Sequence, residues 1–92
     1  MMLVMEGATV ISQFDVIDFD AWRATYSAHA QERGATAITL YRDVDAPTRV
    51  FAIIEWEDAR KAKAYIGDAQ MTGRLMEAGV VGVPEFTFVR RA

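Results

Sequence analysis

The segment RVFAIIEW, residues 49–56, constrains the fold of this chain more than any other stretch. Its β-branched and aromatic residues predict a strand. Side chains alternate between the two faces of a strand, and here both faces are apolar. One face carries Val50, Ala52, Ile54 and Trp56, and the other carries Phe51 and Ile53. A sheet that contains this strand therefore needs a cover on each of its faces.

The segments before this strand predict a strand, a helix and a second strand. Residues 8–14, ATVISQF, are β-branched and apolar and end before an aspartate-rich turn, which is typical of a strand. Asp18 can then cap the helix that follows, and Gly34 suits the left-handed position after its end. Residues 36–43, TAITLYRD, predict the second strand, and the turn VDAPT joins it to residues 49–56 as a hairpin.

Two further helices and a last strand are predicted after the hairpin. Asp58 and Asp68 are each placed to cap a helix, over residues 59–66 and 69–78. The sequence VVGVP then predicts a loop, and EFTFVRR, residues 85–91, predicts the final strand. Three apolar side chains of the last helix have helical spacing and are expected to pack inward: Met71, Leu75 and Met76.

The order β-α-β-β-α-β predicts an α+β, ferredoxin-like fold with a four-stranded antiparallel sheet and helices on one face. The 92 residues make one domain, residues 1–92, whose apolar fraction of 52% is slightly high for a soluble chain. No further element is available to cover the second face of the sheet. We therefore expect a second copy of the chain to cover it in a homodimer.

Composition and charge exclude several classes of function. The chain has no cysteine, a net charge of −3 and only one dense basic site, Arg90–Arg91, which argues against a nucleic-acid partner. The N-terminal MMLVMEG is too short for a signal peptide or a membrane span, so we expect a cytoplasmic protein without a membrane partner. One histidine among scattered carboxylates predicts no metal site, and no motif predicts a cofactor.

An aromatic stripe on the first helix contains the only histidine of the chain. Phe19, Trp22, Tyr26 and His29 recur at helical spacing within residues 18–35. In one interpretation the aromatic rings belong to the core and His29 lies at its edge. In the other, Trp22, Tyr26 and His29 line a pocket, because an apolar body with one polar atom suits such a wall.

Two neighbouring residues of the second strand, and one of the third, are further candidates for a ligand site. Tyr41 and Arg42 point to opposite faces of their strand, so at most one can reach the same pocket. Arg42 needs an anionic partner if it lies within the sheet, and otherwise extends to solvent. Trp56 is either a core residue or a ligand contact.

Three stretches together resemble small bacterial proteins of the dimeric α/β-barrel superfamily. They read VIDFDAWRATYSAHA, VFAIIEWEDARKAKAYI and AGVVGVPEFTFV. The superfamily includes cofactor-independent monooxygenases of antibiotic biosynthesis. The resemblance implies a homodimer in which two sheets pack face to face, with the helices outside and one pocket per subunit between helices and sheet.

We therefore expect a small dimeric protein that binds an aromatic or polyketide-like molecule, with cofactor-independent monooxygenation as a candidate reaction. Such a reaction requires removal of a proton from the substrate, stabilisation of the anion and exclusion of water. His29 is the predicted base and Tyr26 a predicted hydrogen-bond donor, so both are candidate catalytic residues. The candidate ligand-binding residues are Trp22, Tyr41, Arg42 and Trp56.

Two alternatives remain open at the level of the sequence. The same residues could serve a proton-transfer isomerase or cyclase. The chain could also be a non-catalytic dimeric module that binds a small ligand or only packs. Monooxygenase-like members often carry a histidine in the helix after the strand-end tryptophan, whereas this helix carries Tyr65, which favours the non-catalytic alternative.

Overall fold

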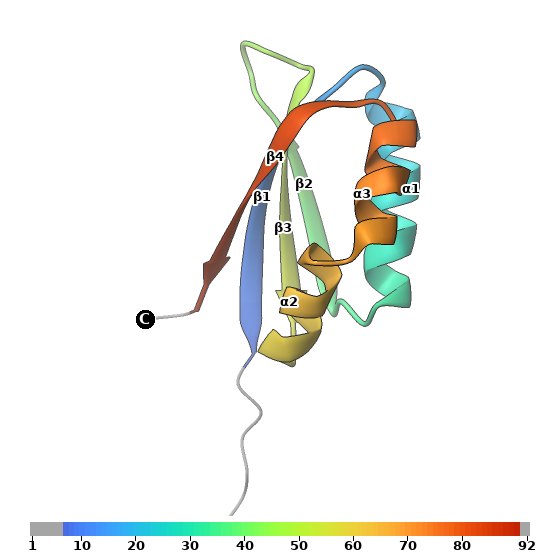
Figure 1. The fold of residues 1–92 in the computed structure, drawn as a ribbon. Helices are drawn as coiled ribbons and strands as arrows, with labels where there is room; N and C mark the ends of the chain where they lie inside the picture. Colours follow the sequence, from blue (N-terminus) through green and yellow to red (C-terminus); the bar gives the residue numbers. More distant parts are fainter. Residues whose placement is uncertain (1–6, 91–92) are drawn as a thin grey trace, which may run out of the picture.

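A computed structural model describes residues 7–90, with the side chains of residues 29, 71 and 72 left out. The chain forms one four-stranded sheet with three helices (Figure 1). The elements are β1 (Ala8–Val16), α1 (Phe19–Glu32), β2 (Ala37–Arg42), β3 (Arg49–Trp56), α2 (Ala59–Ile66), α3 (Ala69–Glu77) and β4 (Val80–Val89).

The strands lie in the order β2-β3-β1-β4, and each neighbouring pair is antiparallel. All three helices lie on one side of this sheet (Figure 1). This arrangement confirms the predicted α+β, ferredoxin-like fold, with the second helical segment divided into α2 and α3 as expected. The other side of the sheet carries no element of the described chain.

Aspartates fix where each of the three helices begins. A carboxylate oxygen of each cap accepts a hydrogen bond from the backbone amide two residues later, and the caps are Asp18, Asp58 and Asp68. Gly34, two residues beyond α1, has a φ of 103°, in the left-handed region that favours glycine. Among the described residues, no helix is long and apolar enough to cross a membrane.

The start of β4 differs from the sequence-based expectation. The VVGVP segment is predicted to be a loop, but β4 begins at Val80 and includes Pro84. Val80 pairs with Val16, which extends the ladder past the predicted end of the first strand. Pro84 has no backbone N–H to donate. It is tolerated because β4 is an edge strand, with no neighbouring strand on its outer side to accept a hydrogen bond.

The core lies between the sheet and the helices, and Phe14 is at its centre. The ring of Phe14 lies 5.2 Å from Trp22, 5.0 Å from Tyr26 and 5.7 Å from Phe86, measured between ring centroids. It thereby joins β1 to α1 and to β4. The same face of β3 contributes the four residues that the alternation predicted, all of them buried: Val50, Ala52, Ile54 and Trp56.

The opposite face of the sheet is also apolar at its centre. Ile11 of β1 is paired with Ile53 of β3, and Tyr41 of β2 is paired with Phe51 of β3. Ile11 is 38% exposed and Tyr41 is 54% exposed. We call this surface, made of Ile11, Tyr41, Phe51, Ile53 and Val89, the open face.

The position of Phe14 predicts a large loss of stability when its ring is removed. Phe14→Ala deletes a buried ring with three aromatic neighbours and leaves a cavity, which should lower the free energy of unfolding by about 3–5 kcal/mol. Val44, which is 95% exposed, provides the control, because Val44→Ala should change stability by less than about 0.5 kcal/mol. Urea unfolding followed by tryptophan fluorescence measures both, and equal losses would contradict the assignment of Phe14 to the core.

Candidate functional site

The aromatic stripe of α1 lies inside the molecule. Trp22 and Tyr26 are both fully buried, and their rings stack with a centroid separation of 5.1 Å and an interplanar angle of 16°. Phe19 is partly buried at the start of the same stripe, 5.8 Å from Trp22. The side chain of His29 lies outside the described part of the structure, so its role as a base stays a prediction.

Three side chains with hydroxyl groups, those of Ser12, Tyr26 and Tyr65, lie at this stripe. The hydroxyl of Tyr26 lies 3.3 Å from the Ser12 hydroxyl, and both residues are buried. The Tyr65 ring of α2 packs edge-on against the Tyr26 ring. Burial raises the pKa of Tyr26 to about 12, an effect that the hydrogen bond with Ser12 only partly offsets. Tyr26 is therefore neutral at physiological pH and can donate a hydrogen bond, but it is not a base.

Tyr65 connects this hydroxyl cluster to the buried end of β3. Burial is the main cause that raises the pKa of Tyr65, with a further contribution from Tyr26. The Tyr65 ring lies 5.3 Å from that of Trp56 and 6.0 Å from that of Tyr26. The indole N–H groups of Trp22 and Trp56 are buried and have no acceptor among the described residues. This region is thus rich in neutral hydrogen-bond donors.

Tyr41 and Arg42 project to opposite faces of β2, as the alternation predicted. Tyr41 pairs with Phe51 on the open face, away from Trp22, Tyr26 and Trp56. The Arg42 guanidinium carbon lies 3.7 Å above the Phe19 ring, on the helical side of the sheet. The structure thus brings Trp22, Tyr26 and Trp56 into one aromatic cluster and separates Tyr41 from it. Ligand contacts by Tyr41, Arg42 and Trp56 stay predictions.

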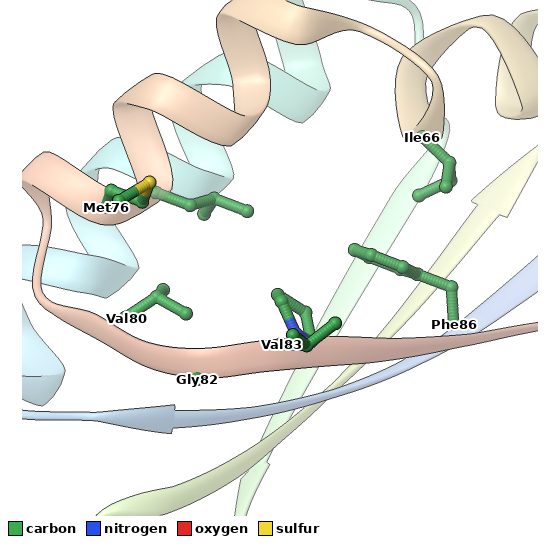
Figure 2. Close-up of a pocket in the computed structure, with 8 residues that line it drawn as sticks. Ile66, Met76, Val80, Gly82, Val83 and Phe86 are labelled. Carbon is green, nitrogen blue, oxygen red and sulfur yellow. The ribbon is translucent and has the colours of Figure 1, made fainter.

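A pocket of about 530 Å³ lies between α3 and β4 (Figure 2). Met76 of α3 forms one side, while Val80, Val83 and Phe86 of β4 form the other. The described residues of its lining are Ile66, Leu75, Met76, Val80, Gly82, Val83, Pro84 and Phe86. None of these described residues has an ionisable side chain.

The pocket adjoins the aromatic cluster through its deepest residues. Leu75 is 3% exposed and belongs to the hydrophobic core, against which Phe86 packs. Phe86 in turn contacts Phe14 edge-on, and Phe14 contacts both Trp22 and Tyr26. A ligand at the floor of the pocket would therefore be separated from the hydroxyl cluster by one or two aromatic rings.

Sequence reasoning missed most of the residues that line this pocket. Because the first residues of β4 are predicted as a loop, no argument from the sequence places Val80 or Val83 opposite a helix. Leu75 is buried as expected, whereas Met76 is predicted to pack inward but is 69% exposed at the pocket. The side chain of Met71 is outside the described part. The helical spacing of Met71, Leu75 and Met76 was a usable signal, but it did not distinguish packing from pocket lining.

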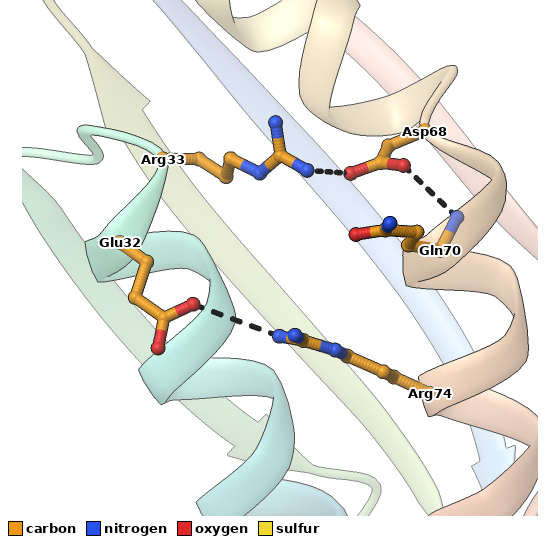
Figure 3. A network of polar contacts seen from close by, with 5 residues as sticks. All are labelled: Glu32, Arg33, Asp68, Gln70 and Arg74. Atoms are coloured by element: carbon orange, nitrogen blue, oxygen red, sulfur yellow. Dashed lines mark hydrogen bonds and ion pairs between the residues drawn. The ribbon is translucent and has the colours of Figure 1, made fainter.

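Helix α3, one wall of the pocket, is tied to the end of α1 by two ion pairs (Figure 3). Arg33 pairs with Asp68, whose carboxylate also accepts a hydrogen bond of 2.9 Å from the Gln70 amide at the start of α3. Glu32 lies 3.6 Å from Arg74, one turn further along α3. These contacts hold the helix against α1 while its other side faces the pocket.

The donor groups of the described chain do not suggest a metal centre. No three histidine or acidic side chains converge anywhere in that part of the molecule. The described residues of the aromatic cluster offer hydroxyl and indole donors. The described residues of the pocket and the cluster provide apolar contact together with hydrogen-bond donation from neutral groups.

The fold and its one-sided helical layer place the chain with the small ferredoxin-like α+β proteins. Solved structures with this fold include SnoaB, a cofactor-independent oxygenase from Streptomyces nogalater, with a TM-score of 0.65 and 15% identity over 95% of this chain and 96% of that one. A protein named as a candidate antibiotic biosynthesis monooxygenase from Nitrosomonas europaea gives a TM-score of 0.67 and 12% identity over 99% and 95%.

A conserved protein from Methanosarcina mazei Go1 is also similar, with a TM-score of 0.70 and 15% identity over 97% of this chain and 96% of that one. No protein-family model matches the chain, and no curated protein matches it by sequence. The chain therefore has the fold of antibiotic biosynthesis monooxygenase-like proteins. At these identities the likeness establishes the fold and leaves the activity to be argued from the site.

The buried Tyr26 hydroxyl predicts a specific alkaline loss of stability. Its pKa is about 12 in the folded protein and near 10 in the unfolded chain, so the unfolded state releases its proton first. Stability should therefore fall as pH rises from about 10 to 12. Tyr26→Phe removes this contribution and should make the decline shallower by up to about 1.4 kcal/mol per pH unit. Urea unfolding across this range tests the difference, and parallel curves for the two proteins would refute the burial-raised pKa.

Proposed function

We propose that this protein binds an uncharged, apolar or aromatic small molecule in the pocket between α3 and β4. The observation that carries this proposal is the pocket itself, which measures about 530 Å³ and has no ionisable side chain among its described lining residues. Ligand sites commonly measure about 300–1,000 Å³ and are predominantly apolar with a few polar groups nearby. A charged ligand would lose its hydration here and gain no compensating partner from the lining.

The neighbouring cluster supports a ligand with one acceptor oxygen, as expected for a phenol, quinol or polyketide-like compound. Tyr26 stays neutral at physiological pH and donates, and the buried indole N–H of Trp22 has no acceptor among the described residues. Phe86 of the pocket lining contacts Phe14, which in turn contacts both Trp22 and Tyr26. A ligand oxygen that reached them would gain hydrogen bonds in a site shielded from water.

Cofactor-independent monooxygenation is the reaction we propose for this arrangement. SnoaB, described as a cofactor-independent oxygenase, shares the fold. In this chemistry the protein deprotonates an electron-rich substrate, holds the anion and excludes water. This proposal requires the substrate oxygen to pass the Phe86 ring and reach the aromatic cluster. There His29 supplies the base, Tyr26 donates to the substrate oxygen, and Trp22 provides an aromatic wall. The same base and donor would serve an isomerase or cyclase that moves a proton without oxygen.

A non-catalytic binding module is the second candidate, and one observation favours it. None of the eight residues that line the pocket can accept or donate a proton. A binding protein needs only the apolar contact that this lining provides. The two candidates differ in whether a bound quinol is turned over.

We also propose that the protein is a homodimer formed through the open face. Ile11, Tyr41 and Phe51 present apolar surface at the centre of the sheet, and no element of the described chain covers them. Contiguous apolar patches of this kind on small proteins mark interaction sites. Packing two sheets face to face buries both copies of the same surface and needs no other partner.

Binding of an uncharged fluorescent probe tests the pocket. N-phenyl-1-naphthylamine should bind the wild-type protein with increased fluorescence and raise the melting temperature, because a ligand that binds only the folded state stabilises it. Leu75→Asp places a charge at the floor of the pocket and should abolish the signal, but it also threatens the core. Met76→Asp, at a residue 69% exposed, supplies a variant that keeps the fold and should weaken binding at least tenfold.

Absence of probe binding to the folded wild-type protein would refute the ligand site.

Turnover is tested separately, by oxygen consumption with a panel of hydroquinones. If the protein is the proposed oxygenase, His29→Ala should lower the rate by roughly a hundredfold, since general-base catalysis contributes about 10²–10⁴. Probe binding without oxygen consumption would favour the non-catalytic binding module over the oxygenase.

Light scattering tests the homodimer. At micromolar concentration the mass should be twice that of the 10.3 kDa chain. Phe51→Asp places a charge on the open face and should give a folded monomer, whereas Ala52→Asp places one on the fully buried face of the same strand and should unfold the subunit. A monodisperse monomer for the wild-type protein would refute the proposed homodimer.

A further inference from the structure

The strand that forms one wall of the pocket carries an irregularity at that point. Gln13 pairs with Glu85 and Asp15 pairs with Val81, so one residue of β1 lies between these pairs while three residues of β4 do. The bulged residues, Gly82, Val83 and Pro84, are all part of the pocket lining. Bulges bend an edge strand and redirect its side chains, and they recur beside functional sites.

The backbone at the bulge suits this redirection. Gly82 has a φ of 75°, in the left-handed region, and a Cβ at that position would meet no atom within 4 Å. Conformation alone, and not a lack of space, therefore requires glycine there. The next residue, Val83, is 92% exposed, which is unusual for a valine within a strand that borders the core.

Exposure divides the pocket lining into a floor and a rim. Leu75 is 3% exposed and contributes to the floor, whereas Met76 and Val83 are 69% and 92% exposed. Met76 comes from α3 and Val83 from β4, on the two sides of the pocket (Figure 2). The opening of the pocket therefore lies between these two side chains.

We infer that the β4 bulge is the specificity-determining rim of the pocket, and that Val83, opposite Met76, limits the width of the uncharged ligand that enters. The inference rests on the proposed ligand site and adds which residue selects among ligands. Val83 makes little contact with the rest of the chain, so its size can act on the opening without changing the core. A regular β4 would have no such residue, because the three bulged residues would be replaced by one.

Two substitutions at Val83 should change binding in opposite directions. Val83→Trp narrows the opening and should weaken binding of N-phenyl-1-naphthylamine at least tenfold. Val83→Ala widens it and should increase the affinity for pyrene, an uncharged ring system that is wider, at least threefold relative to N-phenyl-1-naphthylamine. Fluorescence titration measures each dissociation constant.

Val44 supplies the matched control, because it is 95% exposed in the turn between β2 and β3 and does not line the pocket. Val44→Trp and Val44→Ala should leave both dissociation constants within twofold of the wild-type values. All four variants should keep the wild-type melting temperature within about 3 °C, since surface changes of this kind rarely exceed about 0.5 kcal/mol.

The outcomes separate this inference from the proposed function. If the wild-type protein binds neither probe, both the proposed ligand site and the role of Val83 at its rim are refuted. If the wild-type protein binds but the Val83 variants match the Val44 variants, the pocket stands and the rim assignment is overturned. Opposite shifts for the two Val83 variants, with unchanged Val44 controls, establish Val83 as the residue that limits ligand width.

Discussion

The contact of the Phe14 ring with three other rings holds the layers of this molecule together. Phe14 projects from β1, one of the two central strands, and touches Trp22 and Tyr26 of α1 and Phe86 of β4. It therefore fixes the first helix on the sheet and also positions the strand that forms one wall of the pocket. Packing of the fold and formation of the pocket depend on the same side chain.

The two faces of the sheet are occupied in different ways. The helices bury one face, where Ser12 and Tyr26 form a polar contact within an otherwise apolar layer. The open face has an apolar centre with Ile11 and Phe51. A small domain buries a limited share of its surface, so association through such a face would add burial that a single chain cannot supply.

The pocket arises where β4 departs from regular pairing. If β4 paired regularly with β1, a single residue of β4 would lie opposite Phe14, and no extra residues would face α3. The bulge at Gly82, Val83 and Pro84 turns apolar side chains toward the helix, while the ion pairs of Arg33 and Glu32 hold that helix in place. The pocket therefore has its floor in the core and one wall on the irregular part of an edge strand.

The sequence by itself determined the order of elements, the three aspartate caps and the two apolar faces of β3, because these depend on local propensity and on side-chain alternation. The sequence also placed Trp22 and Tyr26 on one stripe of a helix, but it did not determine whether that stripe faces a ligand. Only the tertiary structure decided that VVGVP continues β4 and lines a pocket with Met76, because strand pairing with Val16 and the approach of α3 are long-range contacts. Local propensity carries no information about such contacts, and glycine and proline in VVGVP pointed to a loop instead.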